Sequence, residues 1–351
     1  MGDSERTNVI VVGAGASQEF NLPTGVELTR IIQKDLSFDV DRFGSIVIGN
    51  GDWELKRAIE VLARETDVSL AIYTNVAMQI SRNMALAPSI DNYLDTHKTN
   101  PELVSVGKLA IANAIIKAER KSSLNIDQSN TYNRLDFSRT TNTWAAVFFK
   151  TIAAKRDYAS FLAALKNITF ISFNYDRCIK QFFGNAAASY FELEDRQIEE
   201  VLTAIEVTHP YGSIGELHVS NGRVAGYALE ANGANIYSAS KRIRTFTEGV
   251  TDTGSLKKIK QPLEQAELVI FLGFSFIDIN MQILKPERAR AKRVLATAKG
   301  RSEDTKNSLK RHIERDFTRF NMKGESVEMY EGKCFELFYE FDRYLASSQS
   351  V

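Results

Sequence analysis

The sequence predicts an α/β fold: a Rossmann-type open, mostly parallel sheet with helices on both faces and an inserted helical cap. Apolar runs at Val9–Val12, Ile168–Phe173 and Val269–Gly273 have the near-continuous hydrophobic character of parallel strands that are covered on both faces. A long stretch with helical periodicity separates the first two runs. With 351 residues, of which 44% are hydrophobic, the chain is long enough for one domain spanning residues 1–351.

Helical patterns dominate the first half of the chain. Pro23-Thr24-Gly25 precedes a helical pattern that runs through Ile32. From Trp53 to about Arg156 one helical pattern follows another, and no strand pattern interrupts them. Asn100-Pro101 marks the start of one of these helices, because Asn is a good N-cap and Pro suits the first helical position. We therefore expect a helical insertion at about 51–160.

The last part of the chain returns to alternating strands and helices. Inside the helical insertion, the polar segment Lys121–Asn133 predicts a surface loop. After the insertion, Arg293–Thr297 predicts a further strand. Asp304–Phe320 has the pattern of a charged amphipathic helix, and Val327–Tyr330 that of a strand. We expect residues from about 300 to 351 to form a C-terminal α/β extension. Its closing helix carries an aromatic-rich stripe of five residues: Phe335, Leu337, Phe338, Phe341 and Tyr344. Such a stripe is typical of core packing, and an oligomer contact is the alternative.

Three loops each follow a predicted strand and carry polar or glycine residues. They are Gly13–Ser17, the turn Asn174-Tyr175-Asp176, and His209-Pro210-Tyr211-Gly212-Ser213. Ligands of open α/β sheets bind at the carboxyl ends of the strands, so these loops are expected to form one site. Glycine in the first loop lets backbone N–H groups approach a phosphate, because it has no Cβ. The pattern predicts a nucleotide site.

These segments, in this order, resemble the sirtuin family, and in particular the sirtuin-like proteins of bacterial antiphage defence. A fourth segment, Leu268–Ser275, looks like the later family strand that ends in a Gly-x-Ser turn. Two further stretches, Ser89–Leu94 and Gly107–Glu119, are similar to the helical insertion of the defence proteins. The resemblance implies that NAD is the ligand and that Asn174 and His209 are the catalytic pair. It also implies a set of residues that contact the dinucleotide: Gly13, Ala14, Gly15, Ser17, Asp176, Gly273 and Ser275.

The chemistry that such a site supports is cleavage of the bond between nicotinamide and ribose. The pyridinium is a good leaving group, so the protein needs only to hold NAD and one ordered water beside the anomeric carbon. The Asn174 amide can bind the ribose hydroxyls and this water, and His209 can accept a proton near neutral pH. Asp176 is expected either to bind the carboxamide of nicotinamide or to orient the turn.

Each candidate also has a structural interpretation. Asn174 could be an Asx-turn residue at the end of a strand. His218 is the main competitor of His209 for the catalytic role, because it is the nearest other histidine in the sequence. Asp91 could face the site from the cap or could cap a helix, and both alternatives stay open at this point.

Composition excludes several classes of protein. The chain has 44 basic and 44 acidic residues, so no net charge favours direct binding of nucleic acid. No signal-like segment and no membrane-spanning apolar run is found, and we therefore expect a cytoplasmic protein that does not insert into membranes. The only cysteines are Cys178 and Cys334, which cannot build the four-thiolate zinc module of deacetylating sirtuins. We expect no metal cofactor.

The function expected from the resemblance is that of an NAD hydrolase, the effector subunit of an antiphage system that depletes NAD in infected cells. The alternative is a non-catalytic NAD or ADP-ribose sensor. A dehydrogenase is disfavoured, because the first loop lacks the third glycine of GxGxxG and no strand with an acidic end follows about twenty residues later. The chain contains no sensor domain, so we expect a homo-oligomer with a separately encoded partner such as a HerA-type ATPase.

Overall fold

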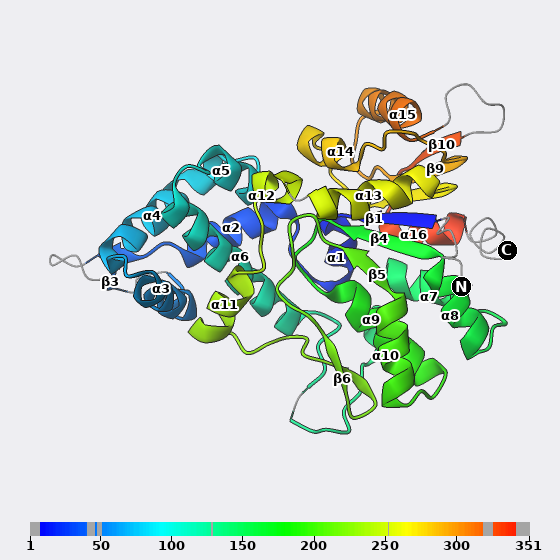
Figure 1. Cartoon of the computed structure of the whole chain (residues 1–351), viewed down its shortest axis with the longest axis horizontal. Coiled ribbons are helices and arrows are strands. Elements are labelled where there is room, and N and C mark those ends of the chain that lie inside the picture. Colours follow the sequence, from blue (N-terminus) through cyan, green and yellow to red (C-terminus); the bar gives the residue numbers. More distant parts are fainter. Residues whose placement is uncertain are drawn as a thin grey trace.

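The computed structural model describes residues 8–40, 46–47, 51–127, 129–251, 253–318 and 326–341. Its centre is a six-stranded sheet in the order β10-β9-β8-β1-β4-β5, and every neighbouring pair is parallel. The predicted Rossmann-type open α/β fold is thereby confirmed (Figure 1). The strands are β1 (Asn8–Val12), β4 (Ile168–Ser172), β5 (Glu206–Thr208), β8 (Leu268–Leu272), β9 (Arg293–Thr297) and β10 (Ser326–Tyr330).

The register of the central strands sets the height at which their loops leave the sheet. Val12, the last residue of β1, is paired with both Ser172 of β4 and Leu272 of β8. The three strands therefore end at the same level, and their following loops start side by side. All fifteen residues of these strands are buried, as expected for parallel strands inside an α/β fold.

Helices cover both faces of the sheet, because alternate strand residues point to opposite sides. Val9 and Val11 pack with the core that includes α13 (Thr253–Gln265), α14 (Asp278–Leu284) and α15 (Glu303–Phe317). Ile10 and Val12 pack on the other face. The helices of that second face are α7 (Trp144–Ala153), α8 (Tyr158–Lys166), α9 (Cys178–Tyr190), α10 (Asp195–Ala204) and α16 (Cys334–Glu340).

A group of helices, which we call the cap, lies at one end of the molecule (left in Figure 1). It consists of α3 (Trp53–Thr66), α4 (Leu70–Asn83), α5 (Ile90–Thr96) and α6 (Pro101–Lys121), with α11 (Gly233–Ser240) packed against α3 and α6. No strand interrupts residues 53–127 or 129–156, as the periodicity predicted. Of the helices in the expected insertion range 51–160, α7 and α8 pack against the sheet instead of the cap.

Local signals placed several helix starts correctly. The side chain of Asn100 accepts a hydrogen bond from the N–H of Leu103 (2.9 Å), and Pro101 is the first residue of α6. Helix α2 (Gly25–Asp35) follows Pro23-Thr24 as expected and begins with a capping box between Thr24 and Glu27. The predicted surface loop after α6 is partly covered: Ser122, Leu124 and Ile126 are buried, whereas residues 129–132 are exposed. The predicted Tyr344 lies outside the described residues.

Several short elements carried too little pattern to be predicted. The pairs β2 (Asp39–Val40) with β3 (Ile46–Val47), and β6 (His218–Ser220) with β7 (Arg223–Ala225), are two-stranded and antiparallel. The remaining helices are α1 (Ala14–Ser17), α12 (Phe246–Thr251) and three 3-10 turns, η1 (Gln18–Phe20), η2 (Met84–Leu86) and η3 (Phe137–Thr140).

Glu19, in the turn that follows the first loop, binds two helix starts at once. One carboxylate oxygen accepts from the N–H of Trp144 (2.6 Å), the first residue of α7, and the other accepts from the N–H of Phe335 (3.0 Å) in α16. Burial raises the pKa of Glu19 to about 7, and the backbone hydrogen bonds oppose this rise. The contacts join a segment near the N-terminus to two helices on the same face of the sheet.

We predict that Glu19→Ala lowers the free energy of unfolding by about 2 kcal/mol, because two helix starts lose their acceptor. Urea denaturation followed by circular dichroism measures the loss. The control is Glu199→Ala on α10, an exposed position where the change should stay within about 0.5 kcal/mol. Equal stability of the two variants would contradict this role of Glu19.

Candidate functional site

Two of the predicted loops are packed backbone to backbone at the carboxyl edge of the sheet. The N–H of Gly13 donates to the carbonyl of Leu272 (2.9 Å), and the N–H of Gly15 donates to the carbonyl of Gly273 (3.0 Å). A Cβ on Gly15 would lie 2.8 Å from the Cα of Gly273. Gly273 has φ of +54°, and a Cβ there would lie 2.2 Å from the backbone nitrogen of Ala16. Both loops need glycine for this contact.

This packing explains why glycine is required at positions 15 and 273, and the explanation differs from the predicted one. The sequence predicts that Gly15 lets a phosphate approach the backbone, but in the structure the Gly15 N–H donates to the carbonyl of Gly273. The structure places Gly13, Ala14, Gly15 and Gly273 together at the site, while contact with a pyrophosphate stays a prediction.

Asn174 lies two residues after β4 and is 8% exposed. Its side-chain Nδ2 donates to the carbonyl of Gly13 (3.0 Å) and to the hydroxyl of Ser17 (2.7 Å). A carbonyl can only accept, so Nδ2 must face Gly13 and both amide hydrogens are used by the first loop. The oxygen Oδ1 is then the group that can bind a ligand, and it can only accept hydrogen bonds.

His209 follows β5 directly and is half-buried. Its Nδ1 lies 2.9 Å from the backbone carbonyl oxygen of Asn174. Since the carbonyl accepts, Nδ1 carries the proton, and the lone pair of the neutral ring is on Nε2. Burial lowers the pKa of His209 below its usual 6.5, against the opposing effects of the Asn174 carbonyl and Asp176. The imidazole is therefore uncharged at neutral pH, with a free lone pair on Nε2.

The other residues of the turn after β4 bind elsewhere. Asp176 is buried and accepts a hydrogen bond from the N–H of Cys178 (3.1 Å) at the start of α9. The hydroxyl of Tyr175 donates to the carboxylate of Asp91 on α5. Asp91 thus faces the turn, while the cap of α5 is Ser89, which accepts from the N–H of Asn92 (3.1 Å). This contact decides between the two roles left open for Asp91.

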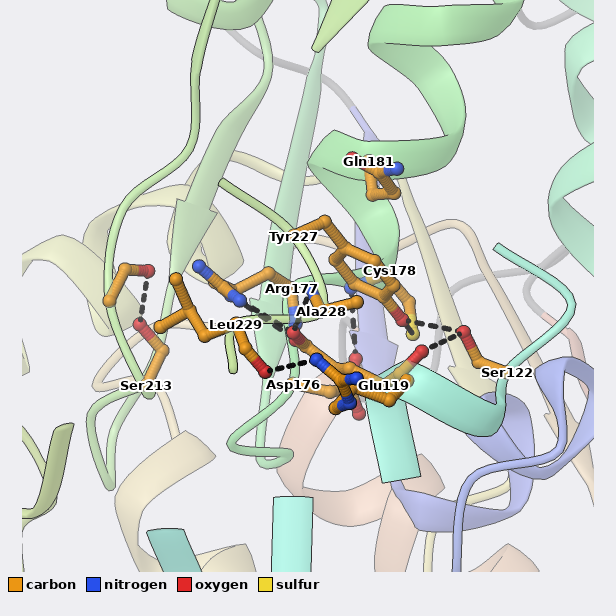
Figure 2. Close-up of polar contacts among 12 residues, drawn as sticks. Glu119, Ser122, Asp176, Arg177, Cys178, Gln181, Ser213, Tyr227, Ala228 and Leu229 are labelled. Atoms are coloured by element: carbon orange, nitrogen blue, oxygen red, sulfur yellow. Dashed lines mark hydrogen bonds and ion pairs between the residues drawn. The ribbon is translucent and has the colours of Figure 1, made fainter. Parts of the chain in front are cut away.

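Arg177, the residue after Asp176, forms a buried ion pair that no sequence pattern predicts. Its guanidinium donates to the carboxylate of Glu119 on α6 (2.5 Å), and Figure 2 shows the two side chains meeting beside Asp176 and Tyr227. Glu119 was noted only as part of the helical insertion. Glu119 lies among Lys117, Arg120 and Lys121 at the charged end of α6, so the sequence gives no signal of a buried partner.

The remaining predicted residues lie at different depths. Ser17 is buried and contacts Asn174, whereas Ser275 is exposed and its carbonyl accepts from the side chain of Arg301 (2.7 Å). The competitor His218 is exposed on β6. Cys178 is buried at the start of α9, where burial raises the pKa of its thiol, as expected for a core side chain.

No family model matches the chain, and no curated protein matches it. Within the described ranges, no helix has both the length and the apolar character needed to cross a membrane. In the same part of the chain, histidine, cysteine and acidic side chains do not gather in groups of three or more suited to hold a metal ion.

The packing of the two loops predicts the effect of a single methyl group at Gly15. Gly15→Ala should lower the free energy of unfolding by about 2 kcal/mol, because the added Cβ meets backbone atoms that cannot move aside easily. The matched control is Gly25→Ala at the first position of α2, where a Cβ would meet nothing within 4 Å. Thermal denaturation of both variants measures the difference, and equal melting temperatures would contradict the close contact.

Proposed function

We propose that this chain is an NAD hydrolase that cleaves the bond between nicotinamide and ribose, releasing nicotinamide and ADP-ribose. The observation that carries the proposal is the pairing of His209 with Asn174. The imidazole is fixed in one tautomer by the Asn174 carbonyl, and the Asn174 amide is fixed by the first loop. A base and an acceptor are thus held together at the sheet edge where α/β proteins bind their ligands.

The proposed reaction uses these groups as follows. Nicotinamide leaves with the electrons of its bond to the anomeric carbon, and a water molecule attacks the resulting oxocarbenium-like ribose. Oδ1 of Asn174 accepts a hydrogen bond from this water or from a ribose hydroxyl, and Nε2 of neutral His209 takes the proton that the attacking water loses. Asp176 keeps the turn in place through the N–H of Cys178.

The ligand contacts and the biological setting are also proposals. The residues proposed to hold the dinucleotide are Gly13, Ala14, Gly15, Ser17, Gly273 and Ser275. The resemblance to defence sirtuin-like proteins supports a role as the effector of antiphage defence through NAD depletion, in the cytoplasm. It supports assembly as a homo-oligomer with a HerA-type ATPase or another separately encoded sensor.

We predict that Asn174→Ala and His209→Ala each lower the turnover of NAD by about a hundredfold, because each group acts in the transition state. Release of nicotinamide from NAD, followed by chromatography, measures this. His218→Ala is the matched control and should keep wild-type turnover. Wild-type protein that binds NAD without releasing nicotinamide would instead support the sensor role. Loss of turnover in the His218 variant, with normal turnover in the His209 variant, would overturn the residue assignment.

The pH profile tests the protonation state of the base. Only neutral His209 can accept a proton, so kcat/KM should fall as the pH drops through the pKa of this residue. Because burial lowers that pKa, the acidic limb should lie below pH 6.5, the usual value for histidine. Measuring kcat/KM for nicotinamide release at about ten pH values between pH 4.5 and pH 8 checks this expectation. A limb at or above the usual histidine value would contradict it.

A further inference from the structure

The carboxylate of Glu119 is fully buried and accepts four hydrogen bonds. Oε1 accepts from the backbone N–H (3.1 Å) and Nε (3.2 Å) of Arg177, and Oε2 accepts from Nη2 of Arg177 (2.5 Å) and from the N–H of Ala228 (3.1 Å). The relative exposure of the Glu119 side chain is 0% and that of Arg177 is 4%. Both oxygens of this carboxylate are therefore engaged, and all four donors come from outside α6.

This arrangement joins the cap to the candidate catalytic turn. Glu119 belongs to α6, and Arg177 follows Asp176 in the turn after β4 (Figure 2). The same turn carries Asn174. Nη1 of Arg177 donates to the carbonyl of Glu216 (3.4 Å), in the segment that follows His209. The N–H of Ile214 in that segment donates to the carbonyl of Tyr175 (3.0 Å). The ion pair thus holds the turn and the segment after His209 against one helix.

A buried ion pair is a costly way to hold a fold together. Desolvation of the two charges offsets much of their attraction, and apolar residues of similar size often stabilise a protein equally well. What the pair adds is a fixed geometry, because four donors of set direction meet one carboxylate. The site needs such a geometry, since the one hydrogen bond of the His209 ring within the described residues is that from Nδ1 to the Asn174 carbonyl, and the ring therefore follows this carbonyl.

We propose that Glu119 and Arg177 are positioning residues that set Asn174 and His209 in the arrangement required for NAD cleavage. This inference rests on the proposed function. When Glu119 loses its charge, Arg177 is left beside Asp176, whose carboxylate becomes its partner. Asp176 then moves away from the N–H of Cys178, and the peptide that holds His209 moves with the turn.

The test compares Glu119→Gln, Arg177→Met and the double variant E119Q/R177M. Glutamine has one acceptor oxygen, so its NH₂ group faces two of the four donors and displaces them. The control is Arg293→Met, which removes a partly buried ion pair with Glu328 between β9 and β10, at the other edge of the sheet. Each variant is assayed for nicotinamide release, for thermal stability and for the pKa of His209 by NMR. The chain has only four histidines, so His97, His218 and His312 serve as internal references.

We expect Glu119→Gln to lower kcat by about a hundredfold with KM changed less than about threefold, as expected for groups that are misplaced by a fraction of an ångström. The pKa of His209 should rise toward 6.5, because the displaced ring gains access to water. Asp176, Glu216 and Lys180 keep their charges in this variant, and the shift of Asp176 toward Arg177 weakens only its small raising effect on the His209 pKa. The double variant should regain thermal stability relative to the two single variants, but not turnover. Arg293→Met should leave both kcat and the His209 pKa at wild-type values.

The outcomes separate this inference from the proposed function. Wild-type protein that releases no nicotinamide would overturn the proposed function, and the NMR measurement would still decide the positioning role. An unchanged His209 pKa in Glu119→Gln and in E119Q/R177M would overturn the positioning role, as would wild-type kcat in the double variant. Should Glu119→Gln fail to fold, the double variant alone decides, because it removes both charges of the ion pair.

Discussion

The structure depends on the turn that follows β4, where consecutive side chains bind different elements. Asn174 reaches the first loop, Tyr175 reaches Asp91 on α5, and Arg177 reaches Glu119 on α6. Asp176 holds the start of α9. A turn with four separate partners has one conformation, because any rotation of its backbone breaks several buried hydrogen bonds at once. This constraint fixes the carbonyl that orients His209.

The sheet supplies the second part of the arrangement. Equal register of β1, β4 and β8 brings their loops to one height, and the absence of Cβ atoms at Gly15 and Gly273 lets two loops touch through their backbones. Ser17 is carried by one of these loops and orients the Asn174 amide. The orientation of the Asn174 amide therefore follows from the strand register and from the two glycines, and it needs no bound ligand.

The sequence was sufficient to predict the parallel sheet and the edge of the sheet at which the candidate site lies. Buried strands have a continuous apolar pattern, and the rule that ligands bind at the carboxyl edge brought Asn174, His209 and the Gly13 loop together correctly. The sequence could not show why residue 15 is a glycine, because the approach of a phosphate and close backbone packing both require the absence of a Cβ. Glu119 and Arg177 are 58 residues apart, and one contact between a helix end and a turn leaves no periodic signal. The same holds for Asp91 and Tyr175.

The two contacts between the cap and the turn limit how the site can open. A displacement of α5 or α6 would separate Asp91 from Tyr175 or Glu119 from Arg177, and breaking a buried ion pair costs about 3–5 kcal/mol. These two contacts therefore hold α5 and α6 of the cap against the turn after β4. A third element, α12, also contacts the cap: Thr247 donates to Asp95 of α5, and Glu248 pairs with Lys108 of α6. The cap thus contacts the chain on both sides of His209 in the sequence: α5 and α6 contact the turn that precedes it, and α12 belongs to the segment that follows it.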